Sequence, residues 1–213
     1  MAVPANLVVL PGGRAEPANT QPPTDQQVLA GLHAKEAWAA RCLVDRLEPI
    51  VERTLYRVLQ HRTSDFEDLV QATFERIIRT LVERRFGARC SLTTWASTIA
   101  THVGVDSLRS RIRERRLFRD GKASGVHQQS SRVDATARLE ARAEVARVQQ
   151  VLARMNPAQA EAVLLHDLLG HDLAEIAAIT GVTVAAAQSR LVRGRRAFLR
   201  RARRAEEKGR TLG

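Results

Sequence analysis

The feature that most constrains the fold of this sequence is a pair of helical patterns separated by a single glycine. Asp172 and Glu175 have the spacing of a capping box, which predicts a helix beginning at Leu173. Gly181 comes at the end of that pattern, and glycine readily adopts the positive φ that a tight turn requires. Thr183 then caps a second, longer predicted helix. Two helices joined in this way predict a helix-turn-helix.

The longer helix has one apolar face and one strongly basic face. Its predicted core stripe, at steps of three and four, consists of Val184, Ala187, Leu191, Gly194 and Phe198. Residues 183–204 include eight arginines and no acidic residue, so the positive charges repel one another without compensation. Such a helix is suited to DNA phosphates and base edges, although a basic tail that binds RNA or ribosomes nonspecifically is an alternative. The candidate DNA contacts are Thr183, Gln188, Ser189, Arg190, Arg193 and Arg196.

The rest of the sequence also predicts helices, because no strand-like alternation outcompetes helical spacing. A proline-rich beginning predicts a flexible tail, and a later stretch rich in glycine, serine and glutamine predicts a linker. We therefore expect an all-α protein with two small helical domains that move independently on a flexible linker. The expected boundaries are a tail at 1–32, a first domain at 33–119, a linker at 120–136, a second domain at 137–206 and a tail at 207–213.

Three helices are expected in the first domain. Pro49 is expected to divide or kink the first of them. Ser64 and Glu67 have the spacing of a capping box that would start the second, whose apolar residues are Leu69, Phe74, Ile77, Ile78 and Leu81. Gly104 weakens the middle of the third and predicts a bend there.

Composition narrows the function classes. The chain has 213 residues and a net charge of +11, which favours polyanionic partners. Cys42 and Cys90 stand far apart and the histidines are scattered, so we expect no metal site and no disulfide framework. No Ser/His/Asp set, paired carboxylates or glycine-rich phosphate loop is apparent. We therefore expect no catalytic residues, no cofactor and no enzyme activity. No apolar run approaches the length of a membrane span and no signal peptide is apparent, which indicates a cytoplasmic protein without membrane insertion.

Two blocks of the sequence resemble a known family. DFEDLVQATFERIIR at residues 65–79, followed by SLTTWASTIATHVGVDSLRSRIRERR at 91–116, resembles region 2 of bacterial sigma factors. Residues 153–200, which contain the helix-turn-helix pattern, resemble region 4 of the same proteins. Both blocks are most similar to the extracytoplasmic-function (ECF) subfamily of the sigma-70 family. The resemblance implies a factor that directs core RNA polymerase to a promoter class and aids promoter melting.

The resemblance also implies partners. The DLVQATF segment would bind the clamp helices of the polymerase β′ subunit through Asp68, Gln71 and Phe74, although Phe74 is equally suited to the core. The β flap would be a second polymerase contact, and an anti-sigma factor would be a regulatory partner. Two alternative functions do not depend on this resemblance: a stand-alone helix-turn-helix regulator, and a basic RNA-binding or nucleoid protein.

Promoter contacts are implied at two places. The minus-ten element would be held by Arg84, Arg85, Phe86, Arg89, Ser91, Thr98, His102, Asp106 and Arg109. Trp95 is expected to be a core residue, and His102 with Asp106 is also suited to a local ion pair. The minus-35 element would be read by the basic face described above. There the sequence departs from the family pattern, because residues 186–188 are Ala-Ala-Gln, which predicts an unusual minus-35 preference.

Overall fold

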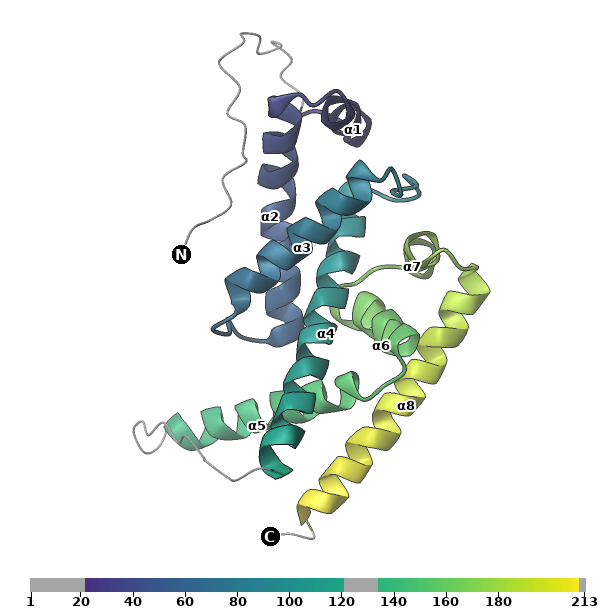
Figure 1. Cartoon of the computed structure of the whole chain (residues 1–213). Helices are drawn as coiled ribbons and strands as arrows, with labels where there is room; N and C mark the ends of the chain where they lie inside the picture. Colours follow the sequence, from purple (N-terminus) through teal and green to yellow (C-terminus); the bar gives the residue numbers. More distant parts are fainter. Residues whose placement is uncertain (1–21, 121–133, 211–213) are drawn as a thin grey trace.

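The structure is a computed structural model that describes residues 22–120 and 134–210, and regular structure in these ranges is helical (Figure 1). The first segment contains α1 (Asp25–His33), α2 (Ala37–Leu59), α3 (Phe66–Val82) and α4 (Leu92–Asp120). The second contains α5 (Asp134–Ala153), α6 (Pro157–Val163), the π-helical turn η1 (Leu164–Leu168), α7 (Leu173–Thr180) and α8 (Val184–Arg210). The all-α class and the two helical segments are as predicted.

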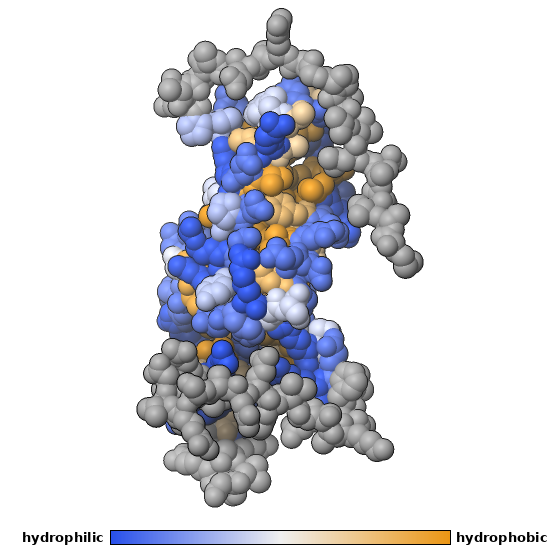
Figure 2. Space-filling view, turned by 90° about the vertical axis from the view of Figure 1, so that its left-hand side faces the viewer, coloured by the Kyte–Doolittle hydropathy of each residue, from blue (hydrophilic) through white to orange (hydrophobic). Residues whose placement is uncertain are grey.

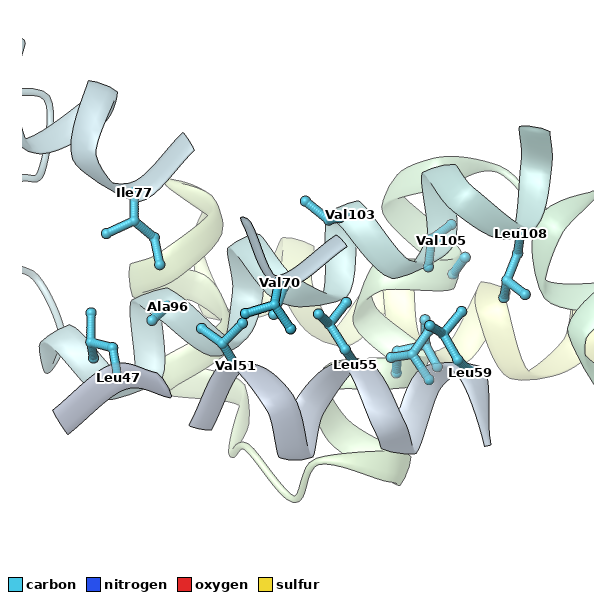
Figure 3. Packing of buried hydrophobic residues seen from close by; sticks show 14 of the residues in the cluster. Leu47, Val51, Leu55, Leu59, Val70, Ile77, Ala96, Val103, Val105 and Leu108 are labelled. Atoms are coloured by element: carbon cyan, nitrogen blue, oxygen red, sulfur yellow. The ribbon is translucent and has the colours of Figure 1, made fainter. Parts of the chain in front are cut away.

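The core of the first segment lies between α2, α3 and α4. The inner face of α2 is a row of aliphatic side chains at helical spacing, all of them at most 2% exposed: Leu43, Leu47, Val51, Leu55 and Leu59. Figure 3 shows the part of this row from Leu47 to Leu59 next to Val70 and Ile77 of α3 and Ala96 of α4. The α2–α4 pair is the most extensive packing in the molecule, so α4 is fixed along much of its length by α2.

Two residues that were expected to disturb their helices lie inside continuous ones. Pro49 lies inside a continuous α2, so the predicted division of this helix is wrong. The ring is on the exposed side, where water can reach the carbonyl that proline leaves without a donor. Gly104 lies inside a continuous α4, where it allows α2 to approach closely: a Cβ at this position would be 2.9 Å from Cγ1 of Val58.

The predicted capping box at the start of α3 is also wrong. The residue that precedes the helix is Asp65, and no side chain caps the first turn. Asp65 instead forms an ion pair with Arg111 of α4 at 2.6 Å. A contact with a distant helix has therefore replaced the local one that the Ser64 and Glu67 spacing suggested.

The segment boundaries differ from the predicted ones at two places. Residues 25–33 of the expected tail and its border form α1, whose Val28 is fully buried. The expected linker is bordered by helices, because α4 continues to Asp120 and α5 begins at Asp134. Residues 121–133 of this linker, residues 1–21 of the first tail and residues 211–213 lie outside the described ranges.

The two segments pack against each other, in contrast to the expected independent movement. Leu152 of α5 and Met155, which follows this helix, belong to the same hydrophobic cluster as Leu108 of α4. Gln149 Nε2 donates a hydrogen bond to the Leu59 carbonyl across the boundary at 2.6 Å. Nothing local to these residues indicates what covers them, so the sequence alone did not reveal that their partner is the first segment.

Candidate nucleic-acid interface

The predicted helix-turn-helix is present, with each predicted local feature in place. The Asp172 side chain accepts from Glu175 N at 2.8 Å, and the Glu175 side chain accepts from Asp172 N at 3.0 Å. Gly181 ends α7 with a φ of 68°. The Thr183 hydroxyl accepts from Ala186 N at 3.2 Å at the start of α8. These caps fix the angle between the two helices because they set where one stops and the next begins.

Apolar contacts hold α7 and α8 together. Ile176 and Ala177 of α7 are buried with Ala187 of α8 and Leu165 of the π-helical turn in a second hydrophobic cluster. Most residues of the predicted apolar stripe of α8 face the core. Val184 is the exception, with 49% of its surface exposed, because it lies in the first turn of α8 before the helix reaches its neighbours.

The outer face of α8 presents polar and cationic side chains to solvent. Gln188, Arg193 and Arg196 are exposed, while Ser189 and Arg190 are half-buried. The Ser189 hydroxyl accepts hydrogen bonds from Arg193 Nε at 3.1 Å and Nη2 at 2.5 Å, so it orients this guanidinium along the helix. An oriented guanidinium is suited to a planar acceptor pair such as a guanine edge.

Arg195 of α8 forms an ion pair with Asp167 of the π-helical turn. Its Nε donates to Asp167 Oδ2 at 3.0 Å, and Nη2 contacts the second carboxylate oxygen. The hydrogen bond from Arg195 lowers the pKa of Asp167 below its ordinary value, although burial opposes this effect. Arg195 therefore joins α8 to the π-helical turn, and it is not among the predicted DNA contacts.

The second candidate surface is the loop at residues 83–91. Arg84, Arg85 and Arg89 are exposed. Phe86 is half-buried, and its ring lies 4.8 Å from the Trp95 ring of α4, so these aromatic side chains anchor the loop to the helix. The Ser91 hydroxyl accepts from Thr94 N at 3.1 Å as the cap of α4. The arginine side chains of the loop are therefore exposed to solvent, whereas Phe86 and Ser91 also hold the loop to α4.

The candidate residues along α4 are in three different environments. Thr98 is buried, and its hydroxyl donates to the Thr94 carbonyl at 3.2 Å. Asp106 is exposed near Arg109 at 3.4 Å and Arg76 at 3.5 Å. Arg109 is half-buried and its Nε donates to the Ala153 carbonyl at 3.4 Å. In this arrangement, Thr98 and Arg109 are engaged inside the protein.

His102 is engaged across the boundary between the two segments. Its Nε2 lies 2.7 Å from Glu161 Oε1 of α6, so the suggested local pair with Asp106 is not the one that forms. The hydrogen bond with Glu161 raises the pKa of His102, and the charge of Asp106 adds to this effect; burial and the charge of Arg76 oppose it. His102 and Glu161 therefore form a latch whose strength depends on the protonation of His102.

We expect this latch to weaken as pH rises. Because pairing raises the pKa of His102, the contribution to closure is complete below about 6.5, the pKa of free histidine, and is lost as pH rises through the raised value. The His102 side chain is 47% exposed, so solvent screens the pair, and we take the value of a screened pair, about 0.2–1 kcal/mol, or about 1.5-fold to fivefold in the ratio of open to closed forms.

Energy transfer between dyes on α3 and α8 should show this pH dependence in the native chain. The dependence should vanish in Glu161→Gln and persist in Glu144→Gln, which neutralises an exposed carboxylate paired within α5. An unchanged pH profile in Glu161→Gln would show that another group is responsible.

The two candidate DNA surfaces lie close together. A side chain at Gly181, the turn of the helix-turn-helix, would be 3.9 Å from Nη1 of Arg89 in the loop. Nearby, the hydroxyl of Ser97 on α4 is 3.0 Å from Nε2 of His171, just before α7. The corner between α7 and α8 therefore rests beside the loop and the first half of α4.

The predicted polymerase-binding residues lie on α3. Asp68 and Gln71 are exposed, whereas Phe74 is half-buried and packs against the core, and its contact with polymerase stays a prediction. Ile78 and Val82 are 49% and 73% exposed, and sequence reasoning missed them as surface residues. Figure 2, which faces the side where α2 and α3 lie, shows hydrophobic surface gathered in the upper half of the molecule. No signal in the sequence separated the exposed Ile78 from the fully buried Ile77 beside it, because adjacent helix positions can both be buried, as Val58 and Leu59 are in α2.

The described ranges lack two other kinds of site. They contain no group of three or more His, Cys, Asp or Glu side chains placed to hold a metal ion. Nor does any helix in these ranges have the length and apolar character needed to cross a membrane.

Comparison with known proteins identifies the family. Residues 43–114 match the family model described as Sigma-70 region 2, and residues 146–198 match the model described as Sigma-70, region 4. Both models define an RNA polymerase sigma factor. The chain belongs to the sigma-70 family, in its ECF group, as its resemblance predicted. It is therefore a transcription initiation factor, and it directs core RNA polymerase to promoters.

Individual relatives agree with this assignment. The chain is 33% identical over 133 residues to the probable RNA polymerase sigma-C factor of Mycobacterium bovis and to the ECF RNA polymerase sigma factor SigC of Mycobacterium tuberculosis. In each case the match covers 62% of this chain and 68% of the relative. Among solved structures, CnrH in complex with the cytosolic domain of CnrY has a TM-score of 0.48 at 23% identity, covering 82% of this chain and 94% of that one.

Proposed function

We propose that three surfaces of this sigma factor divide the work of initiation. The outer face of α8 reads the minus-35 element, the loop at residues 83–91 with the adjoining part of α4 holds the minus-ten element, and α3 binds the polymerase clamp. The observation that carries the proposal is that one chain combines two separate cationic surfaces with an exposed apolar face on α3. A stand-alone regulator would leave that α3 face without a role, and a nonspecific basic protein would not need a capped helix-turn-helix.

Under this proposal the chain performs no chemistry of its own. Its side chains position the polymerase and the separated DNA strand, and the nucleotidyl transfer belongs to the polymerase. We extend the proposal to a cytoplasmic location, because that is where polymerase and promoter meet in a bacterium.

The proposal requires the two segments to separate when the promoter is bound. Promoter elements at minus ten and minus 35 are about 25 base pairs apart, which is about 85 Å of duplex at 3.4 Å per base pair. The loop that would hold the first element lies beside the turn of the motif that would read the second. We therefore interpret the arrangement in Figure 1 as a closed form that opens on the polymerase.

Transcription with purified components tests the proposal. The full chain would be added to core RNA polymerase and a library of genomic fragments, and the 5′ ends of the transcripts would be sequenced. We expect initiation at defined positions that share sequence near minus ten and minus 35. A chain that coats DNA without directing initiation to defined sites would contradict the proposal.

The assignment of α3 has its own control. Ile78→Asp places a charge on the exposed apolar face and should weaken binding to core polymerase about tenfold or more, the cost of a central interface residue. Val44→Asp makes the equivalent change at a valine of α2 that is 40% exposed, and it should bind core polymerase normally. Equal losses in both variants would point to a general effect of the added charge.

A further inference from the structure

Asp25 of α1 joins three helices at the start of α4. Its Oδ1 is 2.8 Å from Nη1 of Arg46 on α2, and its Oδ2 accepts a hydrogen bond from Leu92 N at 2.8 Å. Leu92 is the first residue of α4 and lies next to Ser91, the last residue of the loop. Asp25 itself lies before both ranges that match the sigma-70 family models, so nothing in those matches assigns it a role.

The contact with Leu92 meets a specific need of the helix. The first backbone N–H groups of a helix have no partner inside the helix. At the start of α4 the Ser91 hydroxyl accepts from Thr94 N, and the Asp25 carboxylate accepts from Leu92 N. A carboxylate at this end also interacts favourably with the helix dipole. Asp25 and Arg46 are 34% and 22% exposed, so solvent screens their ion pair only in part.

The helix that carries Asp25 is itself firmly placed. A capping box between Thr24 and Gln27 starts α1, with Gln27 N donating to the Thr24 hydroxyl at 3.3 Å and Thr24 N donating to Gln27 Oε1 at 2.8 Å. Val28 is fully buried, and Gly31 allows a close approach to α2, since a Cβ there would lie 2.7 Å from the Cβ of Ala39. Figure 1 shows α1 at the same end of the molecule as the loop that precedes α4.

The loop depends on the first turns of α4 for its position. Phe86 packs on Trp95, one turn into the helix. Arg84 and Ala88 have positive φ angles of 53° and 49°, an unfavourable backbone conformation for these residues that persists only where surrounding contacts impose it. A shift at the start of α4 would therefore be transmitted directly to the loop.

We propose that Asp25 is a positioning residue for the minus-ten surface. It clamps the first turn of α4 to α2 and so holds the cationic loop in the geometry that captures the melted strand. This inference rests on the proposed function of the loop. It assigns a role in promoter opening to an N-terminal helix that lies outside the two matched regions.

The test uses the full chain assembled with core polymerase. The measurement is the ratio of open-complex formation on a promoter with its intact minus-ten element to that on the same promoter with this element substituted. Asp25→Ala should lower this ratio about fivefold, the scale of one lost helix cap, while core binding stays unchanged. Asp25→Asn keeps an acceptor for Leu92 N and should recover most of the ratio. Arg46→Ala should cause a smaller loss than Asp25→Ala because the contact with Leu92 remains.

Asp45→Asn on the exposed side of α2 is the control for charge. Loss of a negative charge alone would raise DNA affinity equally for all three aspartate variants and leave the ratio unchanged, and this result would overturn the inference. The variant Phe86→Ala distinguishes the role of Asp25 from the role of the loop in holding the minus-ten element. If Phe86→Ala lowers the ratio and Asp25→Ala does not, the inference is wrong and the role of the loop stands. If neither lowers the ratio, the assignment of the loop to the minus-ten element fails as well.

Discussion

Replacing Gly194 with leucine is expected to destabilise the second segment by about 3 kcal/mol, because α8 crosses α6 at this residue with no room for a side chain. A Cβ at position 194 would lie 2.7 Å from the Gln159 carbonyl oxygen and 2.8 Å from Cγ2 of Val163. The nearer atom belongs to the backbone of α6 and cannot rotate away. Glycine inside a helix costs about 1 kcal/mol relative to alanine, so its presence in α8 is explained by this close approach.

Urea unfolding of the full chain, followed by circular dichroism, would measure the effect of Gly194→Leu. Hydrogen exchange at α6 and α8 would show whether the loss is confined to the second segment. Ala185→Leu places the same side chain at an exposed position of α8 and should leave the unfolding midpoint nearly unchanged. A Gly194→Leu protein as stable as the native chain would mean that the two helices do not pack as closely as the structure indicates.

Local signals in the sequence were sufficient to predict the helix-turn-helix. The Asp172 capping box and the positive φ of Gly181 depend on residues within one turn of each other, so the sequence contains all the information. The same kind of signal was present and overlooked at α1, where Thr24 and Gln27 form a capping box inside a stretch rich in proline. The proline-rich composition of the whole stretch predicted a flexible tail, although the four residues from Thr24 to Gln27 already contain the signal for a helix start.

Contacts between distant residues could not be predicted in the same way. Ser64 and Glu67 have the spacing of a cap, but the helix start is set by Asp65 and its ion pair with Arg111 of α4. His102 was identified as a candidate contact, while its pairing with Glu161 on α6 follows from the packing of the two segments. The spacing of apolar residues tells which face of a helix is buried, and it does not tell what covers that face.

The candidate DNA-binding residues illustrate both cases. Gln188 and Arg193 lie on the exposed face of α8 because their positions relative to the buried Ala187 and Leu191 are set by the helical period. Thr98 lies on α4 as predicted, yet it is buried, and its hydroxyl is bonded to the Thr94 carbonyl. Surface position on a single helix is thus predictable, and accessibility in the assembled chain is not.

Replacing Arg193 with alanine should reduce promoter discrimination at the minus-35 element by about tenfold to a hundredfold. The guanidinium is exposed on α8, and two hydrogen bonds to the Ser189 hydroxyl orient it. A bidentate contact between an oriented guanidinium and a guanine edge is worth about 1–3 kcal/mol of discrimination against other bases. Arg193→Lys keeps the charge but lacks the planar fork, so it should lose most of the discrimination and little of the general affinity.

The measurement is holoenzyme binding to promoter fragments that differ at single minus-35 positions, at several salt concentrations. Arg203→Ala, near the far end of the same helix, removes an equally exposed charge. It should weaken binding to all fragments alike and reduce the salt dependence by about one phosphate contact. If Arg193→Ala behaves in the same way as Arg203→Ala, then α8 grips the DNA backbone only, and promoter selection by this protein depends on the minus-ten surface.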